Sequence, residues 1–220
     1  KTLEQHARAD GLLDTRGLRD IVDWPEGERD GYVFRDINTV VNAFHYRSLV
    51  LMSQMAGVLG EQQDANTYEA KARQLYRVFN QRLWNPSRGV YVDGEGTHHS
   101  SLHANLFALA FDLVPAERVA STVKFVKSRG MACSVYAAQY LLEALYKVGE
   151  DQYALELVTS RGKRGWQNMI DAGSTVTLEA WDIAYKKNLD WNHAWGAAPA
   201  NIIPRGMFGI QPLQPGFRKI

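Results

Sequence analysis

The chain has 220 residues, of which 45% are hydrophobic and 22% are charged, a balance typical of one globular domain with a full core. Its 25 lysines and arginines nearly equal its 24 acidic residues, which argues against nucleic acid and membrane surfaces as partners. The single cysteine, Cys133, excludes an internal disulfide, and its apolar neighbours predict a buried thiol. The compartment stays open, with a periplasmic or secreted location slightly favoured.

The beginning of the chain has neither an initiator methionine nor the pattern of a signal peptide. It reads as the middle of a helix, so we expect the chain to be a piece of a longer protein. Apolar residues three and four positions apart then predict a helix that begins near Asp36 and ends at Gly60. A second helix is expected from about Asp64 to Leu83, followed by a loop.

The middle of the chain repeats this plan. Further helices are expected over residues 102–113, 119–126, 136–148 and 153–158. Strand signals are confined to short pieces such as residues 89–93. The expected fold is therefore all-α, with helical hairpins in series. Long loops rich in polar and aromatic residues, near Trp24, Glu95 and Trp191, favour a closed toroid around a central pocket over an open solenoid.

The segment from Gly173 to Gly196 combines aromatic and polar residues in a pattern typical of a sugar-binding site. It holds three of the six tryptophans, together with Glu179, Asp182 and His193. Tryptophan rings offer flat apolar faces to a sugar, while carboxylate and imidazole groups supply directed hydrogen bonds. The alternative is that these residues form an ordinary core, but six polar side chains among the aromatics are more than a plain core tolerates.

Two other loops could contribute to such a pocket. Residues 23–32 carry four carboxylates and Trp24, which Pro25 holds in an extended segment; a solvated charged loop is the alternative. Residues 93–103 carry three histidines, but their spacing matches no strong zinc motif, so we expect no metal there. No activated serine, threonine or cysteine nucleophile is apparent. Glycoside cleavage by two carboxyl groups in an aromatic cleft fits better.

Three stretches carry a resemblance to a known family. They are Gly-Ser-Thr-Val-Thr-Leu-Glu-Ala-Trp-Asp around Glu179, Trp-Asn-His-Ala-Trp-Gly around His193, and Gly-Ile-Gln-Pro-Leu-Gln-Pro-Gly-Phe near the end. With these motifs the chain resembles bacterial alpha-L-rhamnosidases of glycoside hydrolase family 78 over essentially its whole length. The resemblance implies an (α/α)6 toroid of six hairpins and a hydrolysis that inverts the anomeric centre.

By the same resemblance, Glu179 is the general base and His193 binds rhamnose near it. Asp23 and Trp24 are expected to form a wall of the pocket, and Trp181 and Trp195 to add substrate contacts. Asp182 and His193 are expected to orient Glu179 or the sugar. The acid motif of the family is absent, since Glu28-Arg29-Asp30 matches it only superficially.

We therefore expect an incomplete toroid whose general acid lies outside this chain. Residues 1–208 would form the C-terminal two-thirds of the six-hairpin catalytic domain, and residues 209–220 would begin a connection to a C-terminal β-sandwich. The expected partners are a rhamnose-containing glycan or glycoside and the remainder of the parent chain, with no cofactor and no metal. Two alternatives stay open: a six-hairpin hydrolase of another sugar, and a carbohydrate-binding fragment without catalysis.

Overall fold

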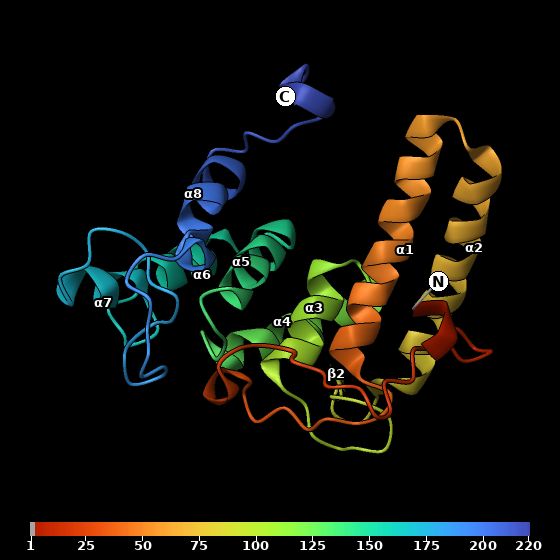
Figure 1. Cartoon of the computed structure of the whole chain (residues 1–220), viewed down its shortest axis with the longest axis horizontal. Helices are drawn as coiled ribbons and strands as arrows, with labels where there is room; N and C mark the ends of the chain where they lie inside the picture. Colours follow the sequence, from red (N-terminus) through yellow and green to blue (C-terminus); the bar gives the residue numbers. More distant parts are fainter. Residues whose placement is uncertain (1–2) are drawn as a thin grey trace. The chain divides into compact units, whose positions relative to one another are not determined.

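The computed structural model describes residues 3–220, which fall into two compact units. The first unit comprises residues 3–22 and Asp30–Ser128, and the second comprises Asp23–Arg29 and Arg129–Ile220. Figure 1 shows that helices are the main regular elements of both, with long loops between them. The prediction of an all-α fold is confirmed, because the only paired strands among the described residues are β1 (Trp84–Asn85) and β2 (Val90–Tyr91).

A long helical hairpin forms most of the first unit. Helix α1 spans Thr39–Leu59 and helix α2 spans Gln62–Arg82, close to the two predicted helices. The carboxamide oxygen of Asn38 caps α1 by accepting from the backbone N–H groups of Val40 and Val41, at 3.0 and 3.2 Å. Gly60 ends α1 with a φ of 80°, a left-handed conformation that glycine adopts without strain.

The first unit continues through the β1–β2 pair into helices α3 (Leu102–Ala110) and α4 (Ala116–Arg129). Strand β2 pairs antiparallel with β1, with Tyr91 opposite Trp84. Helix α3 packs against both α1 and β2, and every residue from Leu102 to Leu109 is buried. Such an all-round apolar helix belongs to the centre of a core.

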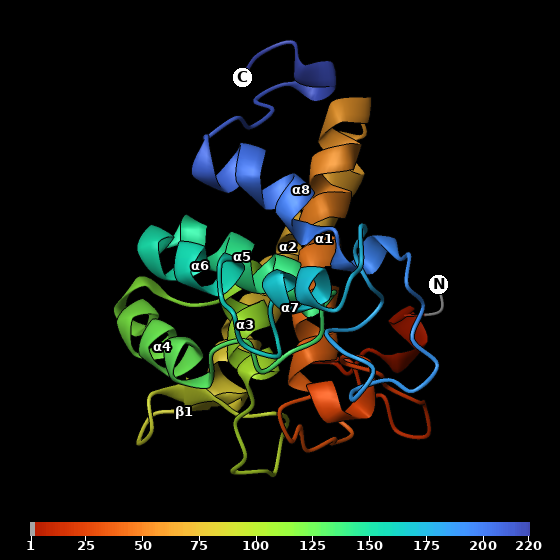
Figure 2. The ribbon, with the colours of Figure 1, turned by 90° about the vertical axis from the view of Figure 1, so that its left-hand side faces the viewer.

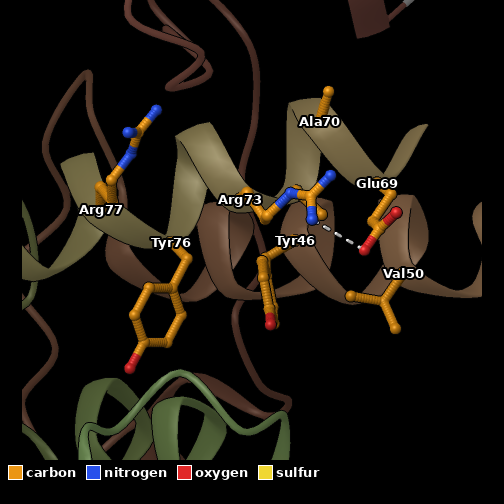
Figure 3. Close-up of a pocket in the computed structure, with 8 residues that line it drawn as sticks. Tyr46, Val50, Glu69, Ala70, Arg73, Tyr76 and Arg77 are labelled. Carbon is orange, nitrogen blue, oxygen red and sulfur yellow. Dashed lines mark ion pairs between the residues drawn. The ribbon is translucent and has the colours of Figure 1, made fainter. Parts of the chain in front are cut away.

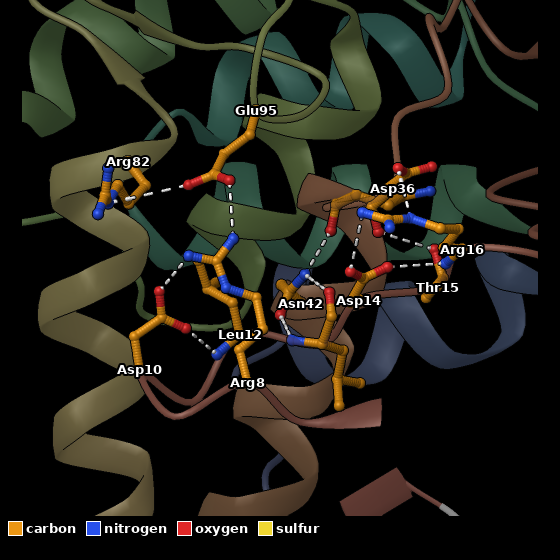
Figure 4. A network of polar contacts seen from close by, with 12 residues as sticks. Arg8, Asp10, Leu12, Asp14, Thr15, Arg16, Asp36, Asn42, Arg82 and Glu95 are labelled. Carbon is orange, nitrogen blue, oxygen red and sulfur yellow. Dashed lines mark hydrogen bonds and ion pairs between the residues drawn. The ribbon is translucent and has the colours of Figure 1, made fainter. Parts of the chain in front are cut away.

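Polar contacts fasten the residues that precede α1 (Figure 4). The carboxamide of Asn42 in α1 accepts from the backbone N–H of Leu13 at 2.7 Å and donates to its carbonyl at 3.2 Å. Arg8 pairs with Asp10 and Glu95, at 2.6 and 2.9 Å. Between residues 3 and 22 the helical structure is limited to a short 3-10 helix over Leu3–His6, and these contacts hold the rest of the segment.

The second unit contains the shorter helices. They are α5 (Ala137–Lys147), α6 (Asp151–Val158), α7 (Trp166–Asp171) and α8 (Ala198–Ile202), and α8 runs into a π-helical turn over Ile203–Met207. Helix α5 contacts both α6 and α8, and Figure 2 shows α5 beside α6. The thiol of Cys133 is free and buried, as predicted. Residues 172–193 have no regular helix or strand.

Candidate active site

Two irregular backbone segments bring Glu179 and His193 together in the second unit. The backbone N–H of Glu179 donates to the carbonyl of Asp190 at 3.1 Å, and that of His193 donates to the carbonyl of Thr177 at 2.9 Å. The Thr177 hydroxyl returns a bond to the carbonyl of His193, also at 2.9 Å. Residues 177–179 and 190–193 thus run side by side, which places Glu179 and His193 close together.

Gly196 locks these stretches against each other. A β-carbon at this position would lie 2.6 Å from the carbonyl oxygen of Leu178 and 2.9 Å from the β-carbon of Thr177. The indole N–H of Trp166 also donates to the Gly196 carbonyl, at 2.7 Å. The glycine is therefore needed for close approach of two backbones.

The carboxylate of Glu179 is almost buried, with its side chain 11% exposed. Its Oε2 atom lies 2.8 Å from the ammonium of Lys186 and accepts from the backbone N–H of Asp190 at 3.2 Å. Partial burial alone would raise the pKa of Glu179. The hydrogen bond from Lys186, the bond from Asp190 and the positive charge of Lys186 outweigh it, so the pKa lies below its ordinary value. Glu179 is thus held as a carboxylate.

His193 and Asp190 complete a cluster around Glu179. One ligand-type atom from each of the three residues lies within 4.8 Å of the others. The fit to a metal ion is poor, because the ammonium of Lys186 already pairs with Glu179 and the backbone N–H of Trp195 donates to Nδ1 of His193 at 3.1 Å. The cluster is better suited to bind a polar, uncharged ligand.

Exposed aromatic rings adjoin this cluster. The indole of Trp195 is 40% exposed, and its ring centroid lies 5.0 Å from that of His193 and 5.7 Å from that of Tyr136. Tyr136 is itself 41% exposed and contacts Tyr140 edge-on at 5.7 Å. The sequence analysis expected Tyr136 only as the start of a helix and did not single it out as a candidate binding residue. Its position immediately before an apolar helix was the only available signal.

Trp181 is buried in the second unit and is not part of the exposed aromatic surface formed by Trp195 and Tyr136. It is fully buried, its indole N–H donates to the Cys133 carbonyl at 2.7 Å, and its ring packs edge-on against Trp166 at 4.9 Å. A side chain without exposed surface offers no face to a sugar. The structure therefore gives Trp181 a supporting position rather than the substrate contact expected from the sequence.

Asp23 is also a supporting residue, because its side chain is buried. Its carboxylate accepts from the backbone N–H of Ser134 at 2.9 Å and from the Ser134 hydroxyl. The same hydroxyl oxygen accepts from the N–H of Tyr136 at 3.1 Å. Asp23 thus fixes the turn that presents Tyr136. Trp24, the next residue, precedes a cis peptide bond to Pro25 and is 39% exposed, so its ring can meet a ligand.

Glu28 forms a buried ion pair. Its carboxylate receives two bonds from the guanidinium of Arg164, at 2.9 and 3.3 Å, and its side chain has no exposed surface. The same guanidinium lies 4.7 Å from the ring centroid of Tyr185. A carboxylate that is buried and fully paired with a guanidinium is poorly placed to protonate a leaving group, so Glu28 has a structural position.

Asp182 was expected to orient Glu179 or the sugar, and its hydrogen bonds go to neither Glu179 nor His193. Its carboxylate accepts from the backbone N–H of Ala184 at 2.9 Å and from the side chain of Asn168 at 3.1 Å. These two bonds, with Lys163 at 3.5 Å, lower the pKa of Asp182. The side chain that pairs with Glu179 is instead that of Lys186, which the sequence analysis did not single out.

The histidine-rich loop of the first unit serves the fold. The buried carboxylate of Asp93 accepts from the backbone N–H groups of Val33 and Ser101, both at 2.8 Å, and bonds Nδ1 of His99. His103 is buried in α3, with its ring 6.3 Å from that of Phe107. The acid and the histidines thus link parts of the first unit.

A hollow on the α1–α2 hairpin is a weaker candidate site (Figure 3). Tyr46 and Val50 of α1 and Tyr76 of α2 line it, and Glu69 pairs with Arg73, one turn further along α2, at 3.0 Å. That ion pair is solvent-exposed on both sides, so neither charge is activated by burial.

Within residues 3–220, no helix is both long and apolar enough to cross a membrane.

The chain is similar to known proteins in sequence and in fold. Residues 1–207 match the family described as the bacterial alpha-L-rhamnosidase 6 hairpin glycosidase domain. An alpha-L-rhamnosidase from Alteromonas sp. (strain LOR) is 27% identical over 199 residues, which cover 84% of this chain and 21% of that protein. The chain thus spans about a fifth of the length of this curated relative.

Solved structures show the same fold. A family 78 rhamnosidase of Bacillus sp. GL1 superposes with a TM-score of 0.80 at 22% identity, covering 99% of this chain and 24% of the other. The alpha-L-rhamnosidase of Streptomyces avermitilis, solved with L-rhamnose, gives 0.75 at 21% identity, covering 97% and 20%. The match over residues 1–207 and the shared helical fold show that the chain belongs to the bacterial alpha-L-rhamnosidase six-hairpin glycosidase domain family.

Proposed function

We propose that the full-length protein carrying this chain is a glycoside hydrolase that releases terminal alpha-L-rhamnose with inversion, and that Glu179 is its general base. The observation that carries the proposal is the state of Glu179: an almost buried carboxylate, kept ionised by Lys186, beside His193 and the exposed ring of Trp195. A general base must be ionised, within reach of water and close to the bound sugar. We infer that the sugar is rhamnose because the similar proteins are named alpha-L-rhamnosidases.

In this mechanism Glu179 accepts one proton from a water molecule as the water oxygen attacks the anomeric carbon. The bond from that carbon to the leaving oxygen breaks, and a general acid donates a proton to the leaving oxygen. Inverting enzymes place the two carboxyl groups about 6.5–9.5 Å apart, which leaves room for the water. We assign the acid to no residue of this chain.

The surface around Glu179 supplies the binding contacts in our proposal. Imidazole nitrogen Nε2 of His193 can bond a sugar hydroxyl, since Nδ1 already accepts from Trp195. The exposed rings of Trp195 and Tyr136 can pack on the apolar face of the sugar, and Trp24 can add a further wall. Asp23 and Trp181 hold this surface from below.

The test is hydrolysis of 4-nitrophenyl alpha-L-rhamnoside by the full-length protein and by Glu179→Gln. We expect kcat to fall by about 10² or more, because glutamine cannot accept the proton of water. Asp171→Asn is the matched control: Asp171 is an exposed carboxylate whose side chain bonds Gln167 on the same helix, and this change should leave turnover intact.

Circular dichroism of both variants checks that they fold. Proton NMR of the first sugar released identifies the anomer, and a beta product from an alpha substrate is the expected result. Full activity in Glu179→Gln would contradict the assignment of the base. Cleavage of another 4-nitrophenyl glycoside in place of the rhamnoside would contradict the sugar.

A further inference from the structure

Lys186 is the charged side chain in closest contact with Glu179. Its ammonium lies 2.8 Å from Oε2 of Glu179, and both side chains are almost buried, with 12% and 11% of their surfaces exposed. Solvent and salt screen an ion pair in such a position less than one on the surface. The ammonium of Lys186 therefore attracts the Glu179 carboxylate more strongly than an exposed lysine would.

The lysine is held in place by its own loop. Its ammonium also donates to the carbonyl and the side-chain oxygen of Asn188, at 2.9 and 3.1 Å. The preceding residue, Tyr185, lies under the guanidinium of Arg164, which in turn is paired with the buried Glu28. The ammonium therefore has three oxygen partners on a loop that is fixed from two sides, which limits its freedom to leave Glu179.

Both contacts of the Glu179 carboxylate end on the same oxygen. The ammonium of Lys186 and the backbone N–H of Asp190 each bond Oε2. An anchored Oε2 fixes the plane of the carboxylate and leaves Oε1 to receive a proton. A general base needs this kind of orientation, because proton transfer requires a heavy-atom distance of about 2.6–3.2 Å.

We propose that Lys186 is a positioning residue for the hydrolysis, whose ammonium anchors Oε2 of Glu179 and so aims Oε1 at the attacking water. This inference rests on the proposed role of Glu179 as the base. Lys186 itself exchanges no proton and touches no reacting atom in this scheme.

The charges around Glu179 determine the sign of the expected pH effect. Lys186 and His193 favour the ionised form of Glu179, and the carboxylate of Asp190, within 4.8 Å, opposes it. Since Lys186 lowers the pKa of Glu179, its removal raises that pKa. The acid limb of the pH profile of kcat/KM, which reports protonation of the base, then moves to higher pH.

The experiment compares Lys186→Met with Lys186→Arg and with Lys187→Met in the full-length protein. Methionine keeps much of the side-chain volume but removes the charge, and Lys187 is the exposed neighbour. With 4-nitrophenyl alpha-L-rhamnoside as substrate, Lys186→Met should lower kcat by roughly tenfold, with KM changed by less than about twofold, because the loss is in the chemical step. The acid limb should move to higher pH.

Lys186→Arg should keep the acid limb near its wild-type pH, since the positive charge remains, and Lys187→Met should match wild type throughout. A readout independent of turnover is the pH titration of the Glu179 carboxyl carbon by NMR, which should show the same upward movement in Lys186→Met. A merely structural lysine would change protein yield or thermal stability without moving either titration.

Two results would overturn the inference in different ways. If Glu179→Gln abolishes turnover while Lys186→Met leaves both the acid limb and the carboxyl titration in place, Glu179 stands as the base and Lys186 has no positioning role. If Glu179→Gln remains fully active, the proposed base fails and the role of Lys186 fails with it.

Discussion

The α1–α2 hairpin and the segment from residue 173 to residue 197 are stabilised in different ways. In the hairpin, each turn of helix repeats the same backbone bonds, and the two helices pack along their length. The segment is instead stabilised by a few hydrogen bonds between residues far apart in the sequence: Trp181 to Cys133, Trp166 to Gly196, and Thr177 to His193.

The difference shows how this chain combines a regular helical scaffold with an irregular segment that carries the candidate site. Stability that is spread over many equivalent contacts tolerates the loss of one of them. The segment that carries Glu179 and His193 has irregular backbone, and each of its long-range contacts joins a different pair of residues. When one of them is lost, no equivalent contact compensates. Single substitutions should therefore have larger effects in the segment than in the hairpin, and three comparisons test this.

The largest effect is expected for Trp181→Ala. This change removes a fully buried indole and leaves the Cys133 carbonyl without its donor, so the free energy of unfolding should fall by about 3–5 kcal/mol. The measurement is denaturant unfolding of the full-length protein, with hydrogen exchange at the amides of Glu179 and His193. Trp191→Ala is the control: its ring is 49% exposed, and it should shift stability by less than about 0.5 kcal/mol. Equal effects of the two changes would contradict the supporting role of Trp181.

A smaller effect is expected for Gly196→Ala. The new methyl group would meet the Leu178 carbonyl at 2.6 Å, and a backbone atom cannot turn aside as a flexible side chain can. Destabilisation of about 1–3 kcal/mol should follow, with faster exchange of the His193 amide. Ala194→Ser, at an exposed position of the same turn, should change little. Unaltered exchange at His193 in Gly196→Ala would show that the two backbones can separate without loss of the site.

The sequence predicted the regular parts of the fold because their signal is local and repeated. Apolar spacing and Gly60 located α1 within a few residues, and the same pattern located α2. The residue types of the segment from Gly173 to Gly196 already predicted a sugar-binding site with Glu179 and His193, and the family resemblance added their separate roles. Their hydrogen-bonded backbones have no periodic signature in the sequence.

Long-range pairing accounts for what sequence reasoning missed. Lys186 contacts Glu179 and Asp182 contacts Asn168, whereas the sequence analysis expected Asp182 and His193 to orient Glu179 or the sugar and did not single out Lys186. Trp181 was expected to contact the substrate, but its indole is buried and bonds the carbonyl of Cys133, 48 positions away. Such contacts are set by how loops cross in three dimensions, and composition cannot report that.

The smallest effect is expected in the hairpin, where two glycines three positions apart should respond in opposite directions. Gly60 has a φ of 80°, and Gly57 lies inside α1; a β-carbon at either would meet no atom within 4 Å. Gly60→Ala should destabilise by about 1 kcal/mol through backbone strain, whereas Gly57→Ala should stabilise by about 0.5–1 kcal/mol through helix propensity. Thermal unfolding of the two variants measures both signs. Because neither glycine is needed for close packing, these values isolate backbone conformation. A loss at Gly60 as large as that at Gly196 would mean that the hairpin, too, depends on single contacts, and the contrast between scaffold and site would fail.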